Sequence, residues 1–381
     1  MKTISLLVLA LLGLAGAPRS ARADEAPLIP TLAIGAPAPD FDLPGVDGRR
    51  YSLESFASAP VLAIVFTCNH CPTAQAYEER IQKLHDDYAA KGVAVVAISP
   101  NDPKAVRLDE LGYTDLSDSL EEMKIRAHDK GFAFPYLYDG ETQAVARQYG
   151  PVATPHVFVF DRARKLRFAG RVDDAENPEK IKVQDTRNAI DAVLAGRPVP
   201  VEKTKVFGCS IKWAEKKGWL AEGLKKWAEE EVTVSPIDAA GLAALAKNDS
   251  TKLRLINVWA TWCGPCVVEF PELVTINRMY RGRAFEVVTI SADPAPLRGD
   301  VEKFLKDKQA STRNYMGSES DDHDAMINAL DPEWQGELPH TMLVAPGGRV
   351  VYRTRGAFDP LALKKAIVGY IGRYYHSVAG K

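Results

Sequence analysis

One segment in the second half of the chain restricts the possible folds most. An apolar run from Leu253 to Trp259 is typical of a buried strand, and Cys263-Gly-Pro-Cys266 follows it, ahead of an apolar segment compatible with a helix. A helix N-terminus stabilises a thiolate, and only the thiolate attacks a disulfide. The order therefore predicts that Cys263 is a nucleophile and that Cys266, one helical turn later, resolves the mixed disulfide. A zinc site is disfavoured because no second cysteine pair lies nearby.

The residues around this pair resemble those of a known superfamily. Trp-Ala-Thr-Trp-Cys-Gly-Pro-Cys at 259–266, together with Glu269, resembles the active site of thioredoxin-fold proteins and, more narrowly, of reductases of the TlpA/ResA type. The resemblance covers about residues 232–375. It implies thiol-disulfide exchange with protein substrates, a contact between Trp262 and the substrate, and a reducing potential set by Gly264 and Pro265.

A proton acceptor beside the thiols is the next requirement of this chemistry. Thioredoxin has a buried Asp six residues before the first cysteine, where this chain has Asn257. Proteins of the TlpA/ResA type instead have a Glu three residues after the second cysteine, and Glu269 matches it. A buried carboxylate there could take and return the proton of Cys266. The alternative is that Glu269 is a solvated helix residue.

The first half of the chain repeats the same order of segments. An apolar strand is followed by Cys68-Asn-His-Cys71 and then by an amphipathic, helix-compatible stretch. Matching the two C-x-x-C pairs predicts that Cys68 corresponds to Cys263. The same matching places Ala74 where the second copy has Glu269. Repetition on this scale indicates two copies of one supersecondary unit rather than a short solenoid repeat.

Two such units fit a chain of 381 residues. The hairpin pattern at residues 35–53 resembles the start of redoxin and AhpC/TSA-type thioredoxin-fold domains. We therefore predict an α/β fold with two thioredoxin-like domains, each a central mixed β-sheet flanked by helices. The expected division is a signal peptide at 1–23, domain 1 at 32–198, a linker with a possible helix at 199–231, and domain 2 at 232–377.

A proline precedes a predicted strand at corresponding places in the two copies, Pro155 and Pro339. The superfamily resemblance implies that both are cis and face the cysteines. It also implies that the preceding residues, Thr154 and Leu338, offer backbone groups to a substrate peptide, which adds as a short strand. The alternative at each site is a trans proline that begins an edge strand.

His70 distinguishes the first cysteine pair from the second. A protonated imidazole beside Cys68 would stabilise its thiolate and make the Cys68/Cys71 disulfide the more oxidising of the two. The Gly-Pro dipeptide of the second pair is typical of reductants. The alternative is that His70 is a solvent-facing loop residue.

Other functions remain open for the first copy. Peroxiredoxins have Thr three residues before the peroxidatic cysteine. At that spacing this chain has Val65 before Cys68 and Cys68 before Cys71, so it lacks the Thr that a peroxidase of this family needs. Cys68, His70 and Cys71 could instead bind copper(I), a soft ion. A binding protein on a redox-inactive frame is a third possibility. Haem attachment needs C-x-x-C-H, and neither pair is followed by His.

Cys209 is the fifth cysteine and belongs to neither pair. It could resolve the Cys68 site, link two chains, or be buried and inert. We expect it to be inert.

The N-terminus predicts export. Lys2 precedes an apolar stretch at 4–17, and Ala21-Arg-Ala23 is a small-x-small cleavage site, so we expect a signal peptide cut after Ala23 and a periplasmic protein. An uncleaved membrane anchor is the alternative. Lys and Arg total 48 against 50 Asp and Glu, which argues against nucleic-acid binding. We expect no metal or cofactor, protein substrates that contain disulfides or thiols, and a membrane electron donor.

Overall fold

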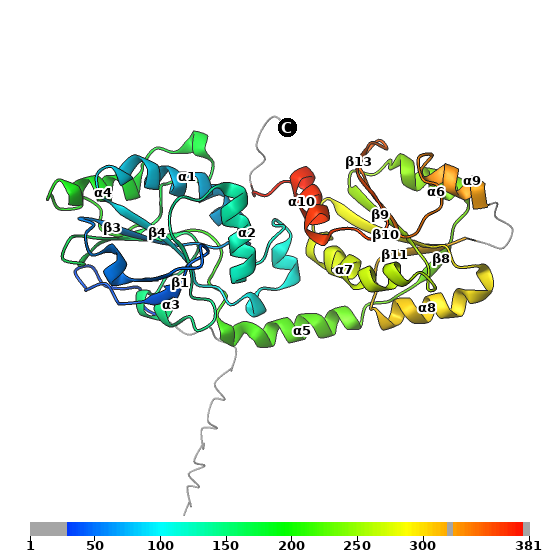
Figure 1. The fold of residues 1–381 in the computed structure, drawn as a ribbon, viewed down its shortest axis with the longest axis horizontal. Helices are drawn as coiled ribbons and strands as arrows, with labels where there is room; N and C mark the ends of the chain where they lie inside the picture. The colour runs from blue at the N-terminus through cyan, green and yellow to red at the C-terminus, as the bar shows by residue number, and fades with distance from the viewer. Residues whose placement is uncertain (1–28, 318–322, 376–381) are drawn as a thin grey trace, which may run out of the picture.

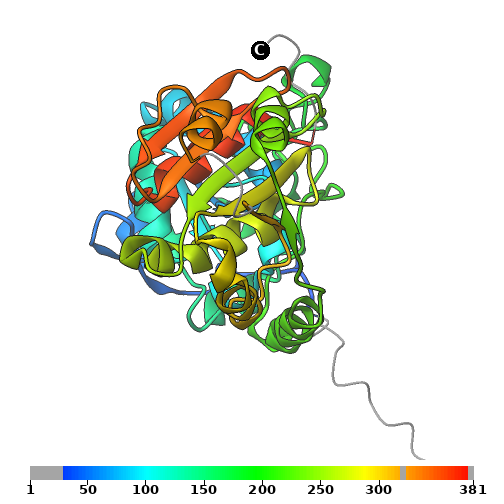
Figure 2. The same cartoon turned by 90° about the vertical axis from the view of Figure 1, so that its right-hand side faces the viewer.

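The computed structural model describes residues 29–317 and 323–375, so the expected signal peptide at 1–23 lies outside the described residues. The described residues form two α/β units that lie side by side, joined by helix α5 (Lys217–Ala228), as Figure 1 shows. Figure 2, seen from the side of the second unit, also places α5 at the edge of the molecule. The predicted fold class is confirmed.

The first unit is built on a mixed five-stranded sheet with the order β5-β4-β3-β6-β7. Strand β3 is parallel to β4 and antiparallel to β6, and a small hairpin of β1 and β2 precedes it, as the sequence predicts. The strands are β1 (Asp42–Pro44), β2 (Arg50–Ser52), β3 (Leu62–Phe66), β4 (Ala94–Ser99), β5 (Tyr136–Tyr138), β6 (His156–Phe160) and β7 (Leu166–Gly170). The helices are α1 (Pro72–Ala89), α2 (Leu120–Lys130), α3 (Ala144–Tyr149) and α4 (Asp185–Leu194).

The second unit has a mixed six-stranded sheet with the order β13-β12-β9-β10-β11-β8. Its strands are β8 (Val234–Pro236), β9 (Leu253–Trp259), β10 (Phe285–Ser291), β11 (Arg313–Met316), β12 (His340–Val344) and β13 (Val350–Arg355). Its helices are α6 (Ala239–Lys247), α7 (Gly264–Tyr280), α8 (Arg298–Asp307), α9 (His323–Leu330) and α10 (Pro360–Ile371). Strand β9 has the bounds that the apolar run predicts.

The central strands β3 and β9 are buried along their whole length. Their near-continuous apolar sequences follow from this, because helices and loops cover both faces of each sheet and a polar side chain would lose its water on either face. Both strands end directly before a cysteine pair. The site segments are therefore anchored to the most buried part of each unit.

Residues 202–213 lie within the expected linker, and the structure packs them against the first unit. Ala169 N donates to Glu202 O at 2.9 Å, and Asp102 N donates to Lys212 O at 3.0 Å. Trp213 is buried in the first unit's core and precedes α5 in the chain. We propose that domain 1 extends to Trp213 and that the linker is essentially α5.

The two units make direct contact. Tyr280 Oη donates to Thr114 O at 2.7 Å, and Arg373 pairs with the Asp115 carboxylate at 2.5 Å. The core of the second unit also takes in two apolar side chains of the first unit, Val106 and Leu111. None of the helices in the described part of the chain is long and apolar enough to cross a membrane.

Candidate active sites

The second cysteine pair lies where β9 turns into α7. Cys263 is the N-cap residue of α7, and its Sγ accepts a hydrogen bond from Cys266 N at 3.3 Å. The two cysteines are joined by a disulfide, with Cα atoms 5.3 Å apart. Cys263 retains 7% exposure whereas Cys266 is fully buried, so Cys263 is the sulfur that a substrate can reach. The neighbouring Trp262 is 64% exposed, an unusual exposure for so large an apolar side chain.

Glu269 is buried one turn beyond Cys266 on α7, so the solvated alternative is wrong. Its carboxylate accepts hydrogen bonds from Asn257 Nδ2 at 3.0 Å and from Phe358 N at 3.1 Å. Burial raises the pKa of Glu269 to about 7, and the two hydrogen bonds only partly oppose this rise. A carboxyl group with this pKa can both accept and return a proton near neutral pH.

Asn257 has a contact that the sequence does not reveal. The sequence shows only that Asn257 replaces the buried Asp of thioredoxin. In the structure its Nδ2 donates both to the Glu269 carboxylate and to the Thr341 hydroxyl, the second bond measuring 2.9 Å. Its place on the strand six residues before Cys263 is the one sequence signal that pointed to it. Asn257 therefore fixes the orientation of the buried carboxyl group.

Both prolines predicted to be cis are cis, at Thr154-Pro155 and Leu338-Pro339. Each precedes a strand that pairs antiparallel with the strand leading into the cysteines. Cys68 Sγ lies 3.2 Å from Thr154 Oγ1, and Cys71 Sγ lies 3.5 Å from Thr154 O. The structure thus brings the residue before the first cis-proline together with both cysteines of its unit.

The predicted match of Cys68 to Cys263 is wrong. Phe66 pairs with the residue after the first cis-proline and Val258 with the residue after the second. Five residues on from each of these lie Cys71 and Cys263 respectively. Cys71 is also the N-cap residue of α1, as Cys263 is of α7.

The corrected register changes the other matches as well. The counterpart of Glu269 is Tyr77, not Ala74, and Ala74 occupies the position of Cys266. The two C-x-x-C pairs are therefore displaced by three residues, one turn of helix. Alignment on the repeated motif hides this shift, whereas strand pairing and helix capping fix it.

The sulfur environments agree with the corrected register. Cys71 Sγ accepts from Ala74 N at 3.4 Å and from Cys209 N at 3.3 Å. Burial alone would raise the pKa of Cys71, but hydrogen bonds from the Cys209 and Cys68 thiols, the His70 charge and the Ala74 N–H outweigh it and lower this pKa. Burial raises the pKa of Cys68, and hydrogen bonding to Cys71 adds to the rise. Cys71 is thus the cysteine of the first site whose thiolate form the surroundings favour.

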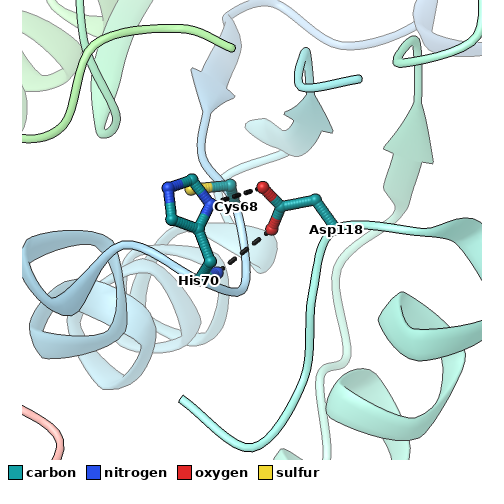
Figure 3. A group of neighbouring side chains, drawn as sticks. All are labelled: Cys68, His70 and Asp118. Atoms are coloured by element: carbon teal, nitrogen blue, oxygen red, sulfur yellow. Dashed lines mark hydrogen bonds and ion pairs between the residues drawn. The ribbon is translucent and has the colours of Figure 1, made fainter. Parts of the chain in front are cut away.

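His70 is buried rather than solvent-facing, and it pairs with Asp118. The two side chains approach to 2.5 Å between Nδ1 and Oδ2, and Asp118 Oδ1 accepts from His70 N at 3.0 Å (Figure 3). Burial lowers the pKa of His70, but the Asp118 charge and hydrogen bond prevail and raise it. No sequence signal near the cysteines identified Asp118, which lies on a loop 48 residues later.

A metal remains chemically possible at this site. The ligand atoms of Cys68, His70 and Asp118 lie within 4.8 Å of one another. The Asp118 carboxylate is, however, already engaged by His70 and by Asn101 Nδ2 at 2.8 Å. The geometry therefore gives these groups a role in holding the loop and placing charge beside the sulfurs.

Comparison with known proteins gives the families of the two units. Residues 34–169 match the AhpC/TSA family and residues 242–367 match the Redoxin family. The thiol-disulfide oxidoreductase ResA of Oceanobacillus iheyensis is 27% identical over 132 residues, 35% of this chain and 60% of that protein. The thiol:disulfide interchange protein HelX of Rhodobacter capsulatus is 25% identical over 137 residues, 36% of this chain and 70% of that protein. ResA of Bacillus subtilis is matched over 49% of its length, so the chain spans only part of these relatives.

Among solved structures, an uncharacterized conserved protein from Geobacillus kaustophilus is 41% identical, with a TM-score of 0.43, over 48% of this chain and 92% of that chain. A hypothetical protein from Sinorhizobium meliloti 1021 is 37% identical with the same TM-score, over 49% of this chain and 97% of that chain. The chain thus carries two thioredoxin-fold domains in tandem, of which the first matches the AhpC/TSA family and the second matches the Redoxin family.

Proposed function

We propose that the protein is an exported thiol-disulfide oxidoreductase that reduces or exchanges disulfides of protein substrates through Cys263 and Cys266. The observation that carries this proposal is the cysteine pair at the N-terminus of α7 with the buried Glu269, of pKa about 7, one turn behind it. This arrangement supplies a nucleophile, a resolving thiol and a proton acceptor in one helix. The names of the relatives support the same class of reaction.

The proposed reduction has two steps. The Cys263 thiolate attacks one sulfur of the substrate disulfide, which forms a mixed disulfide and releases the first substrate thiolate. Cys266 then passes its proton to Glu269 and attacks Cys263 Sγ. The second substrate thiol leaves with a proton returned by Glu269, and two electrons have moved from the cysteine pair to the substrate. A membrane electron donor, which we also propose, would reduce the pair again.

Substrate docking is proposed at the residue before the second cis-proline. The Leu338 backbone would pair with an extended peptide, as strand addition requires, and Trp262 would cover the peptide from the other side of Cys263. Trp262 supports this role because its exposure leaves a large aromatic surface beside the reachable sulfur.

Insulin reduction tests this proposal. The parent protein should reduce insulin disulfides with dithiothreitol as donor, and Cys263→Ser should abolish the activity. Cys71→Ser is the matched control, since it removes the N-cap cysteine of the other domain, and it should retain most of the activity. Loss of activity in Cys71→Ser with retention in Cys263→Ser would reverse the assignment of the two domains.

Export is a separate part of the proposal. It rests on the charged, apolar and small-residue segments before Ala23. Mass spectrometry of the periplasmic fraction should find a mature N-terminus at Asp24. An intact N-terminus in the membrane fraction would support the anchored alternative instead.

A peroxidase activity of the first domain is the second candidate. The lowered pKa of Cys71 and the match to the AhpC/TSA family favour it. Against it, Cys68 stands three residues before Cys71, where the resemblance requires Thr. Hydrogen peroxide consumption by a Cys263→Ser/Cys266→Ser variant tests it, and a rate no greater than that of Cys71→Ser would exclude it.

A further inference from the structure

We propose that Cys209 is a third redox cysteine of the first domain and that its own segment occupies that domain's peptide-docking position. The inference extends the proposed function, because it assigns disulfide exchange to the first domain as well. It replaces our expectation that Cys209 is inert.

The segment that carries Cys209 is held to the first domain at both ends. Before it, Thr204 N donates to Ala169 O at 3.2 Å, on the edge strand β7. After it, Lys212 N donates to the Asn101 side chain at 2.9 Å. Anchors on both sides fix the path of the residues between them, so the position of Cys209 is set by the fold of the first domain.

Between these anchors the segment pairs with the residue before the cis-proline. Thr154 N donates to Cys209 O at 3.0 Å, and the two residues form an isolated antiparallel bridge. The Thr154 backbone is the group expected to receive a substrate peptide as an added strand. In this chain residues 208–210 already occupy that place, so the segment is bound as a substrate would be.

Gly208 makes this approach possible. Its φ is +139°, and a Cβ at this position would lie 2.0 Å from Thr154 O. A side chain is therefore excluded both by backbone conformation and by contact with backbone atoms that cannot move aside. The sequence at this point fits close docking of the segment against the cis-proline turn.

The docked segment presents Cys209 directly to the nucleophile. Cys209 N donates to Cys71 Sγ at 3.3 Å, and the side chains of Cys68, Cys71 and Cys209 pack into one cluster with Ala74. Cys68 and Cys71 are buried, whereas Cys209 is partly exposed. Cys71 thus lies against a buried cysteine, Cys68, and a partly exposed one, Cys209.

The chemistry balances with a small disulfide as oxidant. Cys209, the partly exposed thiol, attacks a low-molecular-weight disulfide, forms a mixed disulfide and gives its proton to the small thiol that leaves. The Cys71 thiolate then attacks Cys209 Sγ, the bond to the small molecule breaks, and the second small thiolate leaves. A Cys71–Cys209 disulfide remains, and two electrons have passed to the small molecule. An extended peptide is excluded from this reaction while the segment is docked.

Disulfide mapping tests the inference in the full chain with Cys263→Ser and Cys266→Ser, which isolates the first site. The protein is oxidised with glutathione disulfide, free thiols are blocked with N-ethylmaleimide, and digested peptides are assigned by mass spectrometry. We expect Cys71–Cys209 as the main disulfide, still formed in Cys68→Ser. A Cys68–Cys71 disulfide with Cys209 alkylated, or no disulfide at all, would overturn the inference.

Two further measurements keep this result interpretable. Gly208→Ala should reduce the yield of Cys71–Cys209 at least tenfold and leave formation of a Cys68–Cys71 disulfide by glutathione disulfide possible, because it displaces only the segment. An unchanged yield would contradict the docking geometry. Insulin reduction by the parent protein depends on Cys263 and Cys266, so failure of the proposed function is seen independently of this test.

Discussion

Replacement of Glu269 by Gln gives the sharpest test of the second site. The buried carboxyl group has a pKa of about 7 in the folded protein against an ordinary value of 4.5. This difference corresponds to about 3 kcal/mol of differential stability between the two protonation states. Glutamine resembles the protonated acid in shape and charge, so the variant should lack this pH dependence.

The direction in which stability changes with pH depends on whether the folded or the unfolded state holds the Glu269 proton more tightly. Between about pH 4.5 and pH 7 the folded state keeps a proton on Glu269 that the unfolded state has lost, so stability falls as pH rises through this range. Above the folded pKa the difference is constant. The variant should therefore gain about 3 kcal/mol relative to the parent between pH 4.5 and pH 8.

Urea denaturation of the oxidised protein measures this gap, because the Cys263–Cys266 disulfide removes both thiols from the titration. The difference between parent and variant at each pH cancels the other titrating groups. Glu302→Gln, on α8, is the matched control because it removes one carboxylate of the same unit away from the cysteines. A gap between parent and Glu269→Gln that does not change with pH would refute the assignment of a raised pKa to this carboxyl group.

Three further changes test other parts of the structure. Asp118→Asn removes the carboxylate whose charge raises the pKa of His70, so the pH profile of Cys71 alkylation by iodoacetamide should move to higher pH; an unchanged profile would contradict the charge pair. Trp262→Ala should raise KM for insulin severalfold and leave reduction of a small disulfide unaltered, and equal effects on both would rule out a docking role. Tyr280→Phe removes one buried hydrogen bond between the domains and should cost about 1 kcal/mol in urea unfolding, with the active-site chemistry unaffected.

The local sequence is sufficient to predict the strand, the helix and the reactive residues of the second site. The bounds of β9 and the cap at Cys263 follow from an apolar run that ends in a cysteine before a helix-compatible segment. Both cis-prolines and the burial of Glu269 follow from the superfamily resemblance. These features need only short stretches of chain, so a single sequence is sufficient to predict them.

Contacts between distant segments could not be predicted in the same way. Asp118 and Cys209 reach the first site from 48 and 138 residues beyond their partners, His70 and Cys71, and neither lies in a recognisable motif. The match of Cys68 to Cys263 failed for a related reason. The repeated C-x-x-C pattern is easy to see in the sequence. The strand register, which decides which cysteine caps the helix, is seen only in the structure.

The two sites differ most in what lies at the cis-proline. At the first, Thr154 N is bonded to the chain's own Cys209 O, so a peptide could dock only after residues 208–210 leave. At the second, no backbone hydrogen bond joins Leu338 to another segment within residues 29–317 and 323–375, and the exposed Trp262 lies beside Cys263. An extended substrate therefore meets an open docking edge at the second site and an occupied one at the first. We therefore propose that repetition of one fold has produced one site that takes other proteins and one that reacts with small disulfides and with its own third cysteine.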